Sequence, residues 1–142
     1  LAGLAFTRTG LTYVHPLSHA VGGLYGLSHG VCNAVLLPIV LEALGSCIYP
    51  QLAILADAAA LPGGEGQTQE ARARAFIAYV CKLNKTLGLQ QTIGEIRKED
   101  IPELVRRALK EAHPSYPVPR YLGAQELAAV LRRAMGEDAT QA

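Results

Sequence analysis

The chain has 142 residues, half of them apolar, and a formal net charge of +1 at pH 7. This length suits one domain with a sizeable core, and the balanced charge gives no argument for nucleic acid or a membrane surface as a partner. The longest apolar segment, residues 31–41, is interrupted by Asn33 and Pro38 and is shorter than the roughly 20 apolar residues of a membrane span. We therefore interpret it as a buried helix.

Periodic apolar residues predict helices along most of the chain. Ser28 is placed to cap the first long helix, and Pro38 predicts a kink within it. A second helix is predicted over residues 49–61, ending at a Pro-Gly-Gly-Glu-Gly turn. Thr68 can cap the next helix, which Gly88 should end.

The last part of the chain predicts two more helices. Asp100 can cap the first of them with its carboxylate, and Glu103 can reach back to complete the cap. The buried stripe of that helix is predicted at Ile101, Leu104, Val105, Ala108 and Leu109. A final helix should turn Leu127, Val130 and Leu131 inward. No alternating run predicts a strand, so the expected fold class is all-α, with about five to seven helices.

The cysteines and the first residue bear on the cellular compartment. Cys32, Cys47 and Cys81 are widely spaced and form no Cys-x-x-Cys pair, which argues against a disulfide framework and for a reducing, cytoplasmic setting. We expect each to be a small buried side chain. The chain starts with Leu and has no signal-peptide pattern, so we expect it to be a piece of a longer protein.

Three of the four histidines, His15, His19 and His29, fall within fifteen residues. His15 and His19 are four residues apart and share one helix face. The glycines between His19 and His29 would let that helix end and bring His29 back over it, in the first turn of the next helix. Imidazole is the commonest ligand for divalent transition metals and a natural proton shuttle. A metal site is one interpretation, and a histidine-filled helix-packing site is the other.

Three residues complicate a metal site. Pro16 cannot donate a backbone hydrogen bond, so the first helix must bend or begin there. His113 is predicted to lie at the negative end of a helix rather than in a ligand set. Asp57 lies on an alanine-rich helix with no histidine near it in the sequence, so no second cluster completes the coordination.

The segment from Phe6 to Pro38 resembles the C-terminal half of the iron-containing (group III) alcohol dehydrogenases. It carries the spacing His-x3-His-x9-His-Gly, followed by Asn-Ala and Leu-Pro. Residues 97–104 and 116–119 resemble the closing helices of the same family. The resemblance extends over essentially the whole chain and is densest in its first forty residues.

The resemblance implies a two-domain enzyme of the dehydroquinate synthase-like type, with residues 1–142 as its helical metal-site domain. An upstream α/β domain would bind NAD or NADP. In that family an aspartate and three histidines hold a divalent ion, usually iron and sometimes zinc. His15 and His29 match the two later ligands, and His19 matches a histidine placed to relay a proton. Phe6 matches an aromatic position close to the same cofactor and substrate pocket.

The activity implied by the resemblance is the interconversion of alcohols with aldehydes or ketones, in a homo-oligomer that is commonly a dimer. A zinc-dependent polyol or glycerol dehydrogenase is an alternative within the superfamily. A non-catalytic helical binding module is an alternative from another class. We expect this chain alone to bind metal weakly, to turn over nothing, and to expose an apolar patch where the other domain packs.

Overall fold

The computed structural model describes residues 12–63 and 66–137, and these two ranges contain helices but no strand. The elements are α2 (Val14–Tyr25), α3 (His29–Leu44), the 3-10 helix η1 (Gly45–Ile48), α4 (Tyr49–Ala58), α5 (Gln69–Thr86), the 3-10 helix η2 (Lys98–Asp100), α6 (Ile101–Ser115) and α7 (Ala124–Ala134). The all-α prediction is confirmed. Phe6 lies outside the described residues.

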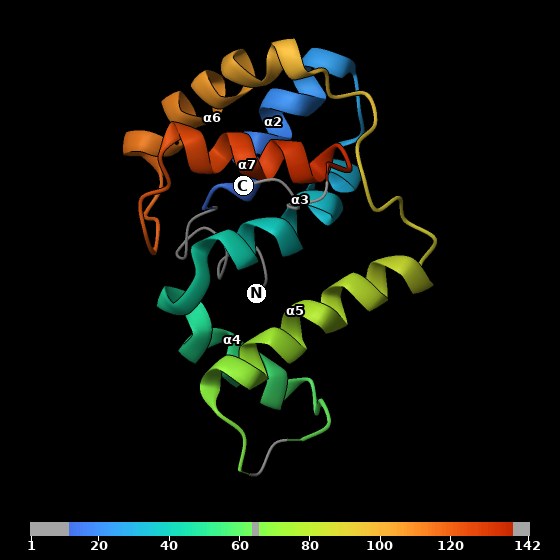
Figure 1. Ribbon diagram of the computed structural model, residues 1–142, viewed down its shortest axis with the longest axis vertical. Coiled ribbons are helices and arrows are strands. Elements are labelled where there is room, and N and C mark those ends of the chain that lie inside the picture. The colour runs from blue at the N-terminus through green and yellow to red at the C-terminus, as the bar shows by residue number, and fades with distance from the viewer. Residues whose placement is uncertain (1–11, 64–65, 138–142) are drawn as a thin grey trace.

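Helix α3 is the central element of the fold. It contacts α2, α5 and α7, while α2 also packs on α6, α6 on α7, and α4 on α5 (Figure 1). Large side chains that are fully buried hold these helices together: Tyr13, Leu17, Leu36, Leu104, Leu127 and Leu131. The inward faces predicted for α6 and α7 are confirmed, with Leu109 alone only half-buried. Helices α2 and α3, which carry the three clustered histidines, are thus anchored in the main core.

Helix α3, η1 and α4 follow one another as one apolar stretch, His29–Ala58. By length and composition this stretch qualifies as a candidate membrane span, which the shorter segment 31–41 did not lead us to expect. Its backbone turns at Gly45, where φ is 65°, and Glu42 pairs with Arg133 of α7. Val35, Leu36 and Val40 are buried among the helices around α3. The buried face of α3 is thus part of the core, and 39% of the most apolar window of the stretch is buried.

Local capping chemistry sets the ends of α5. The Thr68 hydroxyl accepts a hydrogen bond from the Ala71 amide at 3.1 Å, as predicted. Gly88 follows the helix with a φ of 69°, a conformation that favours glycine. Helix α4 ends at Ala58 rather than at residue 61, and the chain then turns through Ala60, whose φ is 50°.

Helix α6 starts at Ile101 with Asp100 in the N-cap position, as predicted, but the predicted side-chain capping bonds are absent. Asp100 makes no side-chain cap; its carboxylate accepts hydrogen bonds from the Tyr25 hydroxyl (2.8 Å) and from Arg97 (2.9 Å). Glu103 pairs with Arg106 and Arg107 instead of reaching back. The predicted cap was wrong because both carboxylates have stronger partners. A hydrogen bond from a charged donor such as arginine is stronger than one from a backbone amide.

The pairing of Glu103 with Arg106 and Arg107 predicts that the stability of the chain depends on pH. Hydrogen bonds from Arg106 and then Arg107 lower the pKa of Glu103 from 4.5 to about 2. Since the folded-state pKa is the lower one, the stabilising contribution is complete above pH 4.5 and is lost as the pH falls toward 2. We expect Glu103→Gln to be less stable than the wild type at neutral pH and equally stable near pH 2. Thermal unfolding followed by circular dichroism across this range measures the difference.

The control for this prediction is salt. The pairs are solvent-exposed, so high salt should shrink the difference between wild type and variant at neutral pH. Two stability curves that stay parallel from pH 4.5 to pH 2 would contradict the assignment.

A buried arginine fastens the loop between α4 and α5. Arg72 is only 4% exposed. Its guanidinium donates to the Asp57 carboxylate and to the carbonyls of Leu61 (3.1 Å) and Pro62 (3.0 Å). Asp57, to which the sequence analysis assigned no role, therefore helps to hold the α4–α5 loop in place through its ion pair with Arg72.

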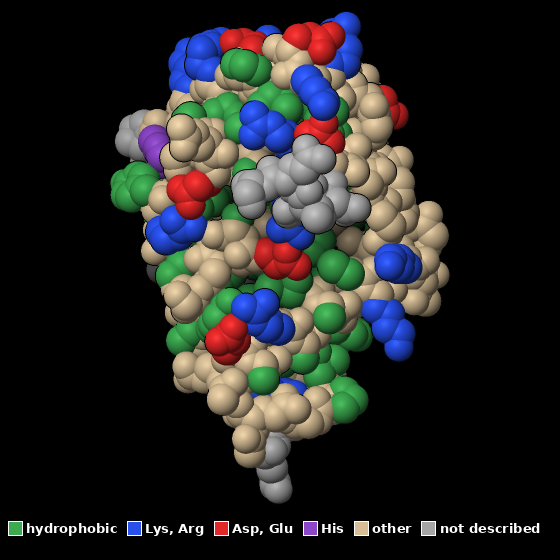
Figure 2. All heavy atoms as spheres, in the orientation of Figure 1, with side chains coloured by type: hydrophobic (Ala, Val, Ile, Leu, Met, Phe, Trp, Pro, Cys, Tyr) green, Lys and Arg blue, Asp and Glu red, His purple; other side chains and the backbone are tan. Residues whose placement is uncertain are grey.

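The charged side chains and the three cysteines complete the description of the fold. Lys and Arg side chains are interspersed with Asp and Glu on the face shown in Figure 2. Cys32 is buried and Cys81 half-buried, and burial raises the pKa of both thiols, so neither is a ready thiolate ligand. Cys47 was expected to be buried but is exposed on η1, where its thiol donates to the Leu44 carbonyl.

Candidate metal and proton-relay site

Helix α2 begins just ahead of the histidine pair. Its first residue is Val14, so Pro16 lies in the first turn, where a backbone amide has no partner within the helix. The proline therefore fits without a bend, and the prediction that the helix begins there is confirmed. His15 and His19 follow one another along the same face.

A tight turn brings His29 back to α2. Gly26 ends α2 in the left-handed conformation, with φ 69° and ψ 27°. Gly22 lets the next segment approach closely, because a Cβ there would lie 3.1 Å from the Leu27 carbonyl oxygen. Ser28 occupies the N-cap position of α3, although its side chain makes no capping bond. His29 is thus the first residue of α3, as predicted.

The three imidazole rings of His15, His19 and His29 lie together. Ring centroids are 5.1 Å apart for His15 and His29, 4.9 Å for His19 and His29, and 6.0 Å for His15 and His19. The rings of His19 and His29 are stacked, with an interplanar angle of 21°. We call these three rings the histidine cluster. Their convergence, which the sequence spacing predicted, is confirmed.

Two hydrogen bonds orient the ring of His29. The Ser18 hydroxyl lies 3.0 Å from Nδ1 and also donates to the His29 carbonyl at 3.2 Å. The Asn33 amide lies 2.9 Å from Nε2. An amide NH2 can only donate, so Nε2 holds the lone pair and Nδ1 carries the hydrogen that Ser18 accepts. Metal-binding histidines are commonly oriented by a hydrogen bond on the ring nitrogen that does not bind the metal, which in His29 would be Nδ1.

His19 is held from another helix. Its Nδ1 lies 2.8 Å from Oε1 of Glu111 on α6, and the same oxygen accepts from the Tyr116 hydroxyl at 3.0 Å. Burial, followed by this bond to Glu111, raises the pKa of Tyr116 and keeps its phenol a donor. The His19 side chain is 47% exposed, so one side of the cluster is open to solvent.

The donor set fits part of a metal site. His15 and His29 offer neutral imidazoles, which suit both iron and zinc. Within residues 12–63 and 66–137, no group of three or more His, Cys, Asp or Glu side chains is arranged to hold an ion by itself. His15 and His29 are thus two donors and not a complete ligand set among the described residues.

The fourth histidine has a structural role. His113 lies in the last turn of α6, as predicted. Its backbone departs from helical geometry there (φ −110°, ψ 117°), and its Nε2 lies 2.8 Å from the Tyr13 hydroxyl. That hydroxyl also accepts from the Leu122 amide at 2.9 Å. Burial raises the pKa of Tyr13, which keeps its hydroxyl a donor to His113. This network ties the start of α2 to the segment before α7.

Sequence reasoning missed three residues around the cluster. Asn33 is four positions after His29 on one helix, a spacing that could have indicated the contact. Ser18 gave no such signal, because it lies 11 positions from His29 on a different helix. Glu111 lies 92 positions from His19, so only the packing of α2 on α6 reveals the pair.

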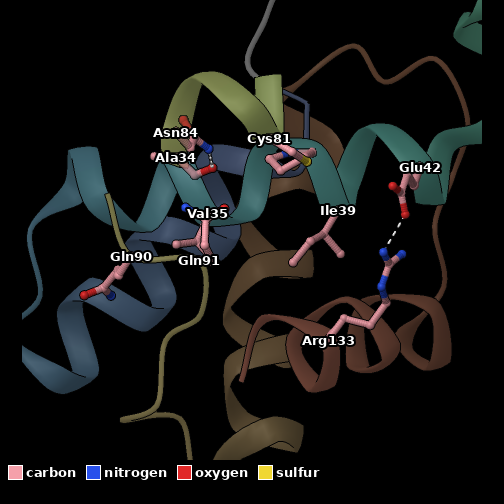
Figure 3. A pocket seen from close by; sticks show the side chains of 10 residues that line it. Ala34, Val35, Ile39, Glu42, Cys81, Asn84, Gln90, Gln91 and Arg133 are labelled. Atoms are coloured by element: carbon pink, nitrogen blue, oxygen red, sulfur yellow. Dashed lines mark hydrogen bonds and ion pairs between the residues drawn. The ribbon is translucent and has the colours of Figure 1, made fainter. Parts of the chain in front are cut away.

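A small cavity elsewhere does not compete as a ligand site. It has a volume of about 110 Å³ and lies between α3, α5 and α7 (Figure 3). The Glu42–Arg133 ion pair and a hydrogen bond from Asn84 to the Ala34 carbonyl (2.7 Å) line it. None of the clustered histidines does, and ligand pockets of drug size begin at about 300 Å³. We interpret it as a packing gap.

Comparisons with known proteins agree on one family. A model of the C-terminal part of the Fe-containing alcohol dehydrogenase family matches residues 1–135. The chain is 36% identical to the 1,3-propanediol dehydrogenase of Klebsiella pneumoniae, over 94% of this chain and 35% of that protein. It is 32% identical to the NAD-dependent methanol dehydrogenase of Bacillus methanolicus, over 95% of this chain and 35% of that protein.

A solved structure extends this likeness to three dimensions. The alcohol dehydrogenase from Oenococcus oeni matches with a TM-score of 0.86 at 28% identity, covering 94% of this chain and 35% of that one. The chain therefore spans about a third of the length of the relatives it matches.

Proposed function

Because the chain belongs to the iron-containing alcohol dehydrogenase family, we propose that it is the helical metal-site domain of an NAD(P)-dependent enzyme that interconverts alcohols with aldehydes or ketones. The observation that carries the proposal is the histidine cluster, in which three rings from α2 and α3 lie within 6.0 Å of one another. The α/β domain that would bind the nucleotide belongs to the remaining two thirds of such a protein.

We assign His15 and His29 as two ligands of a divalent ion, iron or zinc. The position of Ser18 at Nδ1 supports this assignment, because it leaves Nε2 as the coordinating atom, where the ion would take the place of the Asn33 amide. When bound, the ion would act as a Lewis acid toward the substrate oxygen. The nicotinamide would exchange hydride with the substrate carbon. Phe6 is assigned to the same pocket by its match to the family motif.

His19 is the proposed proton relay. Glu111 holds its Nδ1, so the substrate hydroxyl proton would be accepted at Nε2 and released to water. The partial exposure of the ring supports this route to solvent. We propose further that the substrate is a small alcohol or aldehyde, that the enzyme is a cytoplasmic homodimer, and that neither nucleic acid nor a membrane is a partner. Three free thiols support the reducing compartment.

Metal removal tests the proposal on the full-length protein. We expect about one ion per subunit, NAD(P)-dependent oxidation of short alcohols or diols, loss of that activity on chelation, and its return with Fe²⁺ or Zn²⁺. Metal content by mass spectrometry and nicotinamide absorbance are the measurements. Activity confined to glycerol with zinc would favour the polyol dehydrogenase alternative. A full-length protein with neither metal nor turnover would favour the binding module.

A further inference from the structure

Glu111 holds His19 across the interface between α2 and α6. Its Oε1 atom lies 2.8 Å from Nδ1 of His19 and 3.0 Å from the hydroxyl of Tyr116. An ionised carboxylate can only accept hydrogen bonds, so Nδ1 carries the hydrogen. The neutral ring of His19 then has its lone pair on Nε2.

The other contacts of the His19 ring do not determine which of its two nitrogens carries the hydrogen. His19 stacks on His29 with an interplanar angle of 21° and meets His15 edge-on at 74°. These contacts determine the plane of the ring but not which nitrogen bears the hydrogen. Of the contacts described for His19, the one with Glu111 distinguishes Nδ1 from Nε2.

The position of Glu111 is itself supported. Tyr116 lies five positions further along the chain and donates to the same oxygen that His19 contacts. The Glu111 side chain is 32% exposed, and ion pairs of this exposure contribute little to folding stability. A contact that adds little stability but selects one nitrogen of a functional histidine suggests a role in orientation.

We propose that Glu111, supported by Tyr116, is a positioning residue that selects the Nδ1–H tautomer of His19 and keeps Nε2 as the proton-accepting atom. The inference rests on the proposed function, because it takes His19 to be the proton relay. It adds a residue from α6, in the closing part of the chain, to a site otherwise built from α2 and α3.

The direct test is the tautomer of His19. In zinc-loaded full-length protein labelled with ¹⁵N-histidine, long-range ¹H–¹⁵N spectra report which nitrogen is protonated, and His19→Ala assigns the signals. We expect Nδ1–H in the wild type and a shift toward the Nε2–H form, which neutral imidazole ordinarily favours, in Glu111→Ala. Glu111→Gln should keep the wild-type tautomer, because its amide oxygen still accepts from Nδ1–H.

A matched control comes from the same helix. Glu103 pairs with Arg106 and Arg107, and within residues 12–63 and 66–137 it makes no hydrogen bond or ion pair with the cluster, so Glu103→Ala should leave the His19 signals unchanged. His19 remaining in the Nδ1–H form in Glu111→Ala would overturn the proposal. The same spectral change in Glu103→Ala would overturn it too, because the effect would not be specific to Glu111.

Kinetics separate this inference from the proposed function. We expect Glu111→Ala to lower kcat about 10- to 100-fold with KM unchanged, the same range as for residues that orient a metal-binding histidine. Glu111→Gln should recover much of the loss. If His19→Ala leaves kcat unchanged, the relay and the role of Glu111 both fail. If His19→Ala is impaired and Glu111→Ala is not, the role of Glu111 alone fails.

Discussion

Replacing His29 with alanine in the full-length protein should remove the bound metal and lower kcat about a thousandfold. Ser18 and Asn33 orient this ring, and alanine offers no donor atom in its place. Losing several kcal/mol of Lewis-acid stabilisation corresponds to about three powers of ten in rate. The measurements are the metal-to-protein ratio by mass spectrometry and the steady-state rate.

His113 provides the matched control for His29. It is the remaining histidine of the chain, and its ring contacts Tyr13 and Tyr121 rather than the cluster. His113→Asn should keep its metal, even though losing the bond to Tyr13 lowers stability. His29 is exposed, so His29→Ala should keep the helical circular dichroism of the wild type. A His29→Ala protein with full metal content would refute the ligand assignment.

Removing Asp57 should destabilise the chain more than removing Arg72. Asp57→Ala leaves the guanidinium of Arg72 buried without its carboxylate, and we expect a loss of about 3 kcal/mol in the free energy of unfolding. Arg72→Met leaves Asp57 behind, but that carboxylate is 64% exposed and remains hydrated. The lost charged hydrogen bonds to the carbonyls of Leu61 and Pro62 then dominate, at about 2 kcal/mol.

Urea unfolding of the two variants measures this order. Glu70→Ala is the control, because it removes an exposed pair with Arg74 one helical turn away and should change stability little. The reverse order, with Arg72→Met the less stable variant, would mean that the carbonyl contacts and not the ion pair hold the loop.

Local chemistry explains why parts of this fold were predictable from the sequence. A hydroxyl at residue 68 and glycines at 26 and 88 set helix ends whatever the tertiary context, and the structure has those ends. The convergence of His15, His19 and His29 likewise follows from a four-residue spacing and a short glycine-rich return. These signals all act over a few neighbouring residues.

The predictions failed where distant residues compete for a side chain. Asp100 could have capped α6, but Tyr25, 75 positions earlier, donates to its carboxylate. Cys47 is apolar enough for a core but lies on an exposed turn of η1. Glu111 and its contact with His19 depend on how two helices pack, which no local pattern encodes.

The network around Tyr13 has a consequence for the order in which the chain folds during synthesis. Its hydroxyl joins the start of α2 to the Leu122 amide, 109 positions later. The ribosome must therefore release nearly the whole chain before α2 gains this anchor, and contacts of such long range form slowly. Until then the clustered histidines lie on a helix without its final support. Tyr13 is thus translated 109 positions ahead of the residue that anchors it, so the support of the histidine cluster is complete only after residue 122 has been synthesised.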